Sequence, residues 1–185
     1  SLISGPYEGA NRVDIGVNNG GVLWLECLTL GDSADTVSLA AYANAYIRIQ
    51  SGVTTGSGDG YDILLRDNSL FRTFYWETSI NTITLRNNST AHVQGTENIG
   101  IQSVVADNGS VFVCRYCSGA MSSLTLKYGS MARFENTYNA SLEIGALSAT
   151  AQSSVYISDD SSPNAPFFTE SFESPLLNDS NFPNY

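Results

Sequence analysis

SLTLKYGSMARF, Ser123–Phe134, places apolar residues at every second position on both sides of a short turn. Leu124 and Leu126 precede the turn, and Ala132 and Phe134 follow it. Alternation of this kind is typical of a half-buried strand, and Gly-Ser between two such runs is typical of a turn. The stretch therefore predicts a strand, a sharp corner and a second strand.

The same pattern recurs along the chain at intervals of 20 to 24 residues. We name Ser130 the anchor position of its repeat, and the other anchors are Gly21, Ala45, Ser69, Ser89, Ser110 and Ser153. Six and four residues before the anchors, and two and four after them, 27 of 28 residues are apolar, and Thr73 is the exception. Because only 42% of the chain is hydrophobic, this agreement indicates a repeat protein.

The repeat length predicts an all-β fold, a parallel β-solenoid of about seven short coils. The period is too short for four-stranded propeller blades, and the helix of leucine-rich or ankyrin repeats is missing. Each coil buries its inward residues against the coils above and below, so that side chains one repeat apart lie over each other. A third short strand is expected in the later coils, nine residues before the anchors, at Ile80, Ile101, Met121 and Ile144.

The chain divides into three segments. Residues 1–12 lack the period and are expected to lead in, residues 13–160 form the coils, and residues 161–185 form a tail. The tail combines four prolines with several phenylalanines, which argues against both a regular coil and a disordered end. Because an open solenoid end exposes unpaired backbone, we expect the tail to cap it or to wrap a neighbouring subunit.

Composition limits the partners. With 8 basic and 18 acidic residues the formal net charge is −10, which argues against nucleic acid and against an anionic membrane surface. No apolar run is long enough to insert into a membrane. Three cysteines, Cys27, Cys114 and Cys117, do not predict a disulfide framework, and Cys114 is expected as a buried free thiol. Because a zinc site needs four ligands, the CRYC motif predicts no metal, and no cofactor is predicted.

One outward face gathers arginine and aromatic residues. Three residues after the anchors stand Trp24, Arg48, Arg72, His92, Val113, Arg133 and Tyr156, and five after them stand Glu26, Gln50, Phe74, Gln94, Arg115, Glu135 and Ser158. Rings stack on apolar sugar faces, and planar polar groups hydrogen-bond hydroxyls in pairs. The predicted glycan-binding residues are Trp24, Glu26, Arg48, Arg72, Phe74, Tyr75, His92, Arg133 and Tyr156. A subunit interface, also enriched in aromatics and arginine, is the alternative.

A second outward column carries no charge. Five residues before the anchors stand Gly16, Ala40, Leu64, Thr84, Val105, Thr125 and Ser148. Exposed uncharged strips mark contact with another chain more often than with water. Parallel association of several solenoids about a common axis is expected to use this column.

Two carboxylates form a candidate catalytic pair. Glu77 and Glu97 both stand eight residues after their anchors, with Tyr75 and Trp76 beside the first. Neighbouring coils lie about 4.8 Å apart, close to the roughly 5 Å that separates the two carboxylates of a retaining glycosidase. Two solvated glutamates at corners are the alternative.

The short coils, the Gly-Ser corners, the scarcity of lysine and the aromatic, proline-containing end resemble the right-handed parallel β-helix domains of bacteriophage tailspikes and tail fibres. The resemblance implies a right-handed solenoid in a homotrimeric, virion or extracellular protein that binds a host receptor or surface polysaccharide. A glycosidase that cleaves bacterial surface polysaccharide and a purely structural shaft are the alternative functions.

Overall fold

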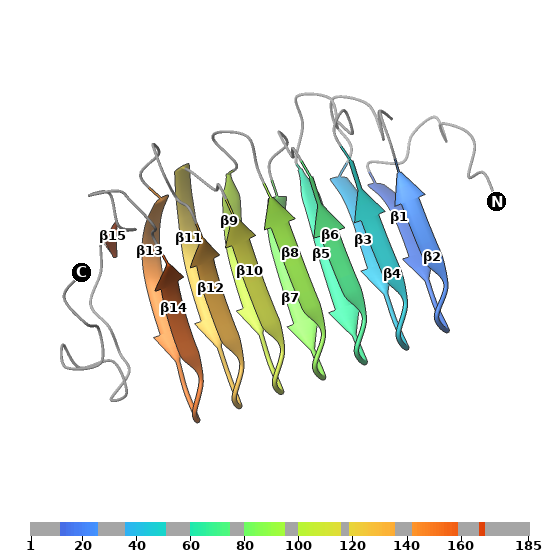
Figure 1. Ribbon diagram of the computed structural model, residues 1–185. Helices are drawn as coiled ribbons and strands as arrows, with labels where there is room; N and C mark the ends of the chain where they lie inside the picture. The colour runs from blue at the N-terminus through green and yellow to red at the C-terminus, as the bar shows by residue number, and fades with distance from the viewer. Residues whose placement is uncertain are drawn as a thin grey trace.

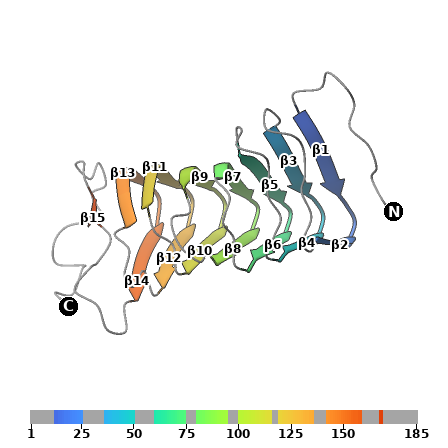
Figure 2. The same ribbon diagram turned by 90° about the horizontal axis from the view of Figure 1, so that it is seen from above.

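The protein is a parallel β-solenoid made of two sheets (Figures 1 and 2). The computed structural model describes residues 12–25, 36–50, 60–74, 80–94, 100–115, 119–135, 142–158 and 167–168. Sheet A contains β1 (Arg12–Val17), β3 (Thr36–Ala41), β5 (Tyr61–Arg66), β7 (Ile80–Arg86), β9 (Ile101–Ala106), β11 (Gly119–Leu126), β13 (Leu142–Ala149) and β15 (Phe167–Phe168). Sheet B contains β2 (Val22–Leu25), β4 (Tyr46–Ile49), β6 (Leu70–Thr73), β8 (Thr90–Gln94), β10 (Val111–Arg115), β12 (Met131–Glu135) and β14 (Ser154–Ser158).

Successive coils stack in register, as the repeat predicts. In sheet A, Ile63 pairs with Ile83, Ile83 with Val104, and Val104 with Leu124. Sheet B is also parallel from β2 to β14. Side chains one repeat apart therefore form columns, and the predicted inward and outward columns are confirmed for the residues that the structure describes.

The core lies between the sheets and is filled by residues from every coil. One inward column of sheet B alternates large and small residues, Phe71, Ala91, Phe112 and Ala132, all fully buried. Because coils are only about 4.8 Å apart, this alternation gives each ring space above and below. The ring of Phe112 meets that of Phe134 edge to face, with centroids 6.1 Å apart.

Thr73, the polar exception to the inward pattern, is fully buried and hydrogen-bonded. Its Oγ1 accepts a hydrogen bond from the backbone N–H of Gln94 at 3.0 Å and donates to the carbonyl of the same residue at 3.4 Å. A threonine is tolerated here because the neighbouring strand satisfies its hydroxyl.

Each corner from sheet A to sheet B uses two consecutive residues with positive φ. The seven pairs are Asn19-Gly20, Ala43-Asn44, Asp67-Asn68, Asn87-Asn88, Asn108-Gly109, Tyr128-Gly129 and Ala151-Gln152. Backbone hydrogen bonds join each corner to the next, for example from the N–H of Gly129 to the carbonyl of Ala151 at 2.8 Å. The corners consequently align along one edge of the solenoid (Figure 1).

A buried serine closes five of these corners. Each hydroxyl donates to the carbonyl three residues earlier at 2.6 to 2.7 Å, and the serines are Ser69, Ser89, Ser110, Ser130 and Ser153. These serines are five of the seven anchor residues, so a serine at the anchor position stabilises the corner by this hydrogen bond.

The expected third strand is wrong. Ile80, Ile101, Met121 and Ile144 belong to the strands of sheet A. Tyr61 pairs with Ile80 but Asp62 pairs with Thr82, which leaves Asn81 as an extra residue in the ladder. Because of this extra residue, Ile80 and Ile83 are both buried although they are three positions apart. The alternation of buried and exposed residues is therefore interrupted, and the sequence pattern suggests two strands where there is one.

Cys114 of β10 is fully buried but forms a disulfide, so the expectation of a free thiol is wrong. Its partner lies outside the described residues.

In the tail, Phe167 and Phe168 pair with Glu143 and Ile144 of β13. These two residues therefore add a short strand, β15, to sheet A beside β13.

Candidate functional site

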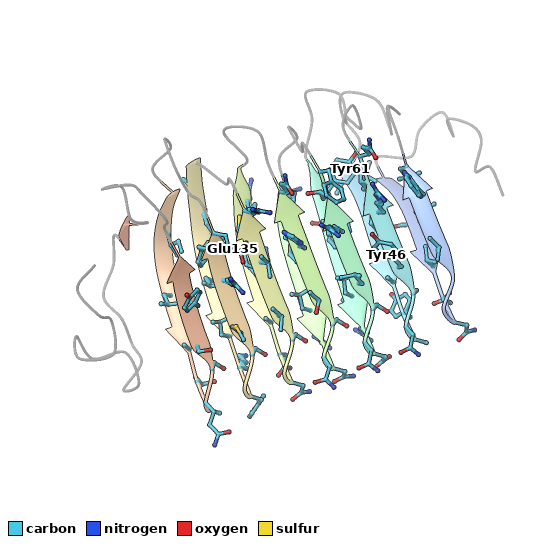
Figure 3. The ribbon with its side chains drawn as sticks, viewed as in Figure 1. Tyr46, Tyr61 and Glu135 are labelled. Carbon is cyan, nitrogen blue, oxygen red and sulfur yellow. The ribbon has the colours of Figure 1, made fainter. Side chains whose placement is uncertain are left out.

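The outer face of sheet B, here the sheet-B face, carries side chains in three columns. The first column, one residue after the anchors, contains Val22, Tyr46, Leu70, Thr90, Val111, Met131 and Ser154. The central column contains Trp24, Arg48, Arg72, His92, Val113, Arg133 and Tyr156. The third lies at the ends of the strands or one residue beyond them and contains Gln50, Phe74, Gln94, Arg115 and Glu135. Figure 3 labels Tyr46 in the first column and Glu135 in the third.

Aromatic rings and guanidinium groups alternate over the first three coils. The Cζ atom of Arg48 lies 4.1 Å from the ring centroid of Trp24 and 4.9 Å from that of Phe74. The Cζ atom of Arg72 lies 4.4 Å from the Phe74 centroid. These distances are typical of cation–π contacts, which fix both the rings and the guanidinium planes. We name Trp24, Arg48, Phe74 and Arg72 the stacked cluster.

The opposite end of the face repeats the chemistry with a carboxylate added. The Cζ atom of Arg133 lies 5.3 Å from the ring centroid of Tyr156. Glu135 forms an ion pair with Arg133, and its Oε2 lies 3.8 Å from Nε of Arg115. One carboxylate thus contacts two arginines and offsets one of their two positive charges.

The arginines of the stacked cluster have no such carboxylate among the described residues. Nη2 of Arg48 donates to Oε1 of Gln50 at 3.3 Å, which is a neutral acceptor. The Nε atoms of Arg48 and Arg72 are buried and have no hydrogen-bond partner in the described part of the chain. The described side chains of this half of the face therefore carry a positive charge, on a chain with a formal net charge of −10.

His92 lies in the central column next to Arg72. Burial is the main cause that lowers its pKa, and the positive charges of Arg72 and Arg115 lower it further, whereas Glu135 raises it. The imidazole is consequently neutral at pH 7. Its Nε2 is buried and has no hydrogen-bond partner among the described residues.

Apolar surface is exposed along the same face. The exposed fractions are 54% for Trp24 and 52% for Tyr156, and Val22, Leu70 and Met131 of the first column are also exposed. Open rings, apolar side chains and oriented donors together can bind a ligand that presents both apolar faces and hydroxyl groups.

The structure brings together most of the predicted binding residues. Trp24, Arg48, Arg72, Phe74 and His92 lie in neighbouring coils, and Arg133 and Tyr156 lie on the last two strands of the same face. The predicted residues Glu26 and Tyr75 and the predicted catalytic pair Glu77 and Glu97 lie outside the described residues.

The first column and Glu135 are not among the binding residues predicted from the sequence. The apolar side chains of Val22, Leu70 and Met131 stand one residue after their anchors, so the same register would have identified them. The contact of Glu135 with Arg115 crosses from one strand to the next, and only the register of β10 and β12 reveals it.

Other features of the described residues are limited. No group of three or more histidine, cysteine or acidic side chains gathers there in a way that could hold a metal ion. The described part of the chain also forms no helix that is long and apolar enough to cross a membrane. Comparison of the whole chain with models of protein families, with curated proteins and with solved structures gives no match.

Proposed function

We propose that this chain is a receptor-binding or adhesion module of a virion fibre or spike, and that its sheet-B face binds a cell-surface glycan. The stacked cluster carries the proposal, because it sets rings and guanidinium groups side by side on consecutive strands. Rings match the apolar faces of sugars, and guanidinium donors match their hydroxyl groups. Since these side chains stand on a continuous β-ladder, little conformational entropy is lost when a ligand binds.

The shape of the face favours a polymer over a single sugar. The central column runs along the solenoid axis from Trp24 to Tyr156, crossing seven strands. Six steps of about 4.8 Å separate these two rings by about 29 Å. An extended oligosaccharide can therefore contact both ends of the face.

Two observations support an assembled, extracellular protein. The outer column of sheet A has no charged residue, and its largest members, Leu64 and Val105, are half-buried within the isolated chain. We assign this column to the contact between subunits of a homotrimer, which leaves the sheet-B faces open. The disulfide of Cys114 favours an oxidising environment such as a virion surface.

Binding of the purified chain to a panel of immobilised bacterial surface polysaccharides tests the proposal. Binding to one or a few polysaccharides is expected, with a loss of at least about tenfold in Trp24→Ala. The matched control is Tyr128→Ala, which removes an exposed aromatic at a corner. Silence of the wild-type chain on the panel, as a purely structural shaft predicts, contradicts the proposal.

A further inference from the structure

Charge is unevenly distributed along the sheet-B face. At the end formed by β10, β12 and β14, Glu135 contacts both Arg115 and Arg133. At the other end Arg48 contacts two rings and the neutral Gln50, and Arg72 contacts the ring of Phe74. Within the described ranges, no acidic side chain forms an ion pair with either of these two arginines.

Arg48 and Arg72 are also direct neighbours. They occupy opposed positions of β4 and β6, where side chains of adjacent parallel strands lie about 5 Å apart. Like charges placed opposite each other on neighbouring strands destabilise a sheet. An anion bound between the two guanidinium groups offsets this repulsion.

The rings prepare the two arginines for such a ligand. Trp24 and Phe74 lie on both sides of Arg48, and Phe74 also contacts Arg72, which limits the rotation of both side chains. A guanidinium group held in place offers a planar pair of donors that matches the oxygen atoms of a carboxylate or a phosphate. These arginines therefore lose little side-chain conformational entropy when the ligand binds, because they are already ordered in the free protein.

We infer that the glycan bound by the sheet-B face is anionic, and that its carboxylate or phosphate groups contact Arg48 and Arg72. This inference rests on the proposed function and adds the chemical class of the ligand. Tyr156, exposed at the far end of the face, stacks on an uncharged part of the polymer.

The test compares native acidic polysaccharides with neutral forms of the same polymers. Each polysaccharide is presented in three states: native, carboxyl-reduced and dephosphorylated. The chain is expected to bind native acidic polymers, and removal of one type of acidic group should weaken binding at least about tenfold, which identifies that group as the ligand. Raising NaCl from about 0.05 M to about 0.5 M should weaken the same binding.

Arg72→Gln is the corresponding protein variant, with Arg48→Gln as a second. Arg86→Gln is the matched control, because Arg86 is an exposed arginine of sheet A and its loss changes the net charge equally. Binding of the acidic polymer should fall at least about tenfold in either cluster variant and less than about twofold in the control. Thermal unfolding of all three variants confirms that they are folded.

The outcomes separate this inference from the proposed function. If the chain binds neutral polymers, or binds native and neutralised forms equally, the anionic ligand is wrong while glycan binding stands. If the cluster variants and Arg86→Gln bind the acidic polymer equally, the assignment to Arg48 and Arg72 is wrong. If no polysaccharide binds in any form, the proposed function itself is wrong.

Discussion

The guanidinium carbon of Arg48 lies 4.1 Å from the ring centroid of Trp24, although 24 positions separate the two residues in the sequence. That separation equals one repeat, and the pairing of β2 with β4 converts it into direct contact. The sheet-B face is built by this same conversion at every coil. The positions of the side chains on this face therefore depend on the register in which the strands of sheet B pair.

A double-mutant cycle measures the contact between Trp24 and Arg48. We expect Trp24→Ala and Arg48→Ala to couple by about 0.5 to 1 kcal/mol in the free energy of unfolding, because a half-exposed cation–π pair is lost in either variant. Urea unfolding of the wild type, the two single variants and the double variant gives this value. Additivity within about 0.3 kcal/mol would show that the contact contributes no stability.

Gly129 and Gly16 provide a matched test of the corner conformation. A Cβ atom added at either glycine meets no atom within 4 Å, but only Gly129 has a positive φ, of 73°. Gly129→Ala should therefore destabilise the protein by about 1 to 2 kcal/mol through backbone strain alone. Gly16→Ala should be neutral or slightly stabilising, because alanine reduces the entropy of the unfolded chain. Equal effects of the two substitutions on urea unfolding contradict the corner geometry.

The lowered pKa of His92 predicts a dependence of stability on pH. Above about pH 7.5 neither the folded nor the unfolded chain protonates this imidazole, so its contribution is constant. Between about pH 7 and 5.5 the unfolded chain takes up the proton first, and the free energy of unfolding should therefore fall as the pH falls. In His92→Gln this part of the slope should disappear. Identical pH profiles for the two proteins would show that the surroundings of His92, namely Arg72, Arg115 and Glu135, leave its pKa unchanged.

Two valines on opposite sheets test the proposed assembly. Val105 stands in the uncharged outer column of sheet A, and Val111 stands on the sheet-B face. If sheet A forms the subunit contact, Val105→Arg should lower the mass in solution from trimer to monomer, because it buries an unpaired charge in the interface. Val111→Arg should leave the mass unchanged. Light scattering coupled to gel filtration distinguishes them, and dissociation by Val111→Arg instead would make the sheet-B face the interface.

The columns could be predicted from the sequence because a strict two-residue alternation and a nearly constant period leave few registers. The pairing of Leu124 with Val104 follows directly from that period. The boundaries of the sheet-A strands could not be predicted in the same way. The extra residue Asn81 shifts the alternation, and only the register of β5 and β7 shows that Ile80 continues the strand.

Two other features depend on the assembled backbone. Ala43 and Ala151 have positive φ values, of 54° and 48°, although alanine has no intrinsic preference for that conformation. Neighbouring corners stabilise it through shared hydrogen bonds, as between the N–H of Asn44 and the carbonyl of Asp67, and between the N–H of Gly129 and the carbonyl of Ala151. Arg115 and Arg133 contact a carboxylate, whereas Arg48 contacts the neutral Gln50. This difference depends on the directions of the side chains, which the sequence pattern does not give.

Hydroxyl-radical footprinting of the chain with and without a bound surface polysaccharide tests the glycan-binding face most directly. Exposed aromatic and sulfur-containing side chains react fastest, and four of them divide between two surfaces. Trp24, Met131 and Tyr156 lie on the sheet-B face, and Tyr128, 63% exposed, lies at a corner. We predict that the polysaccharide protects the first three from oxidation and leaves Tyr128 reactive. Protection of Tyr128 without protection of Trp24, Met131 and Tyr156 would contradict the account.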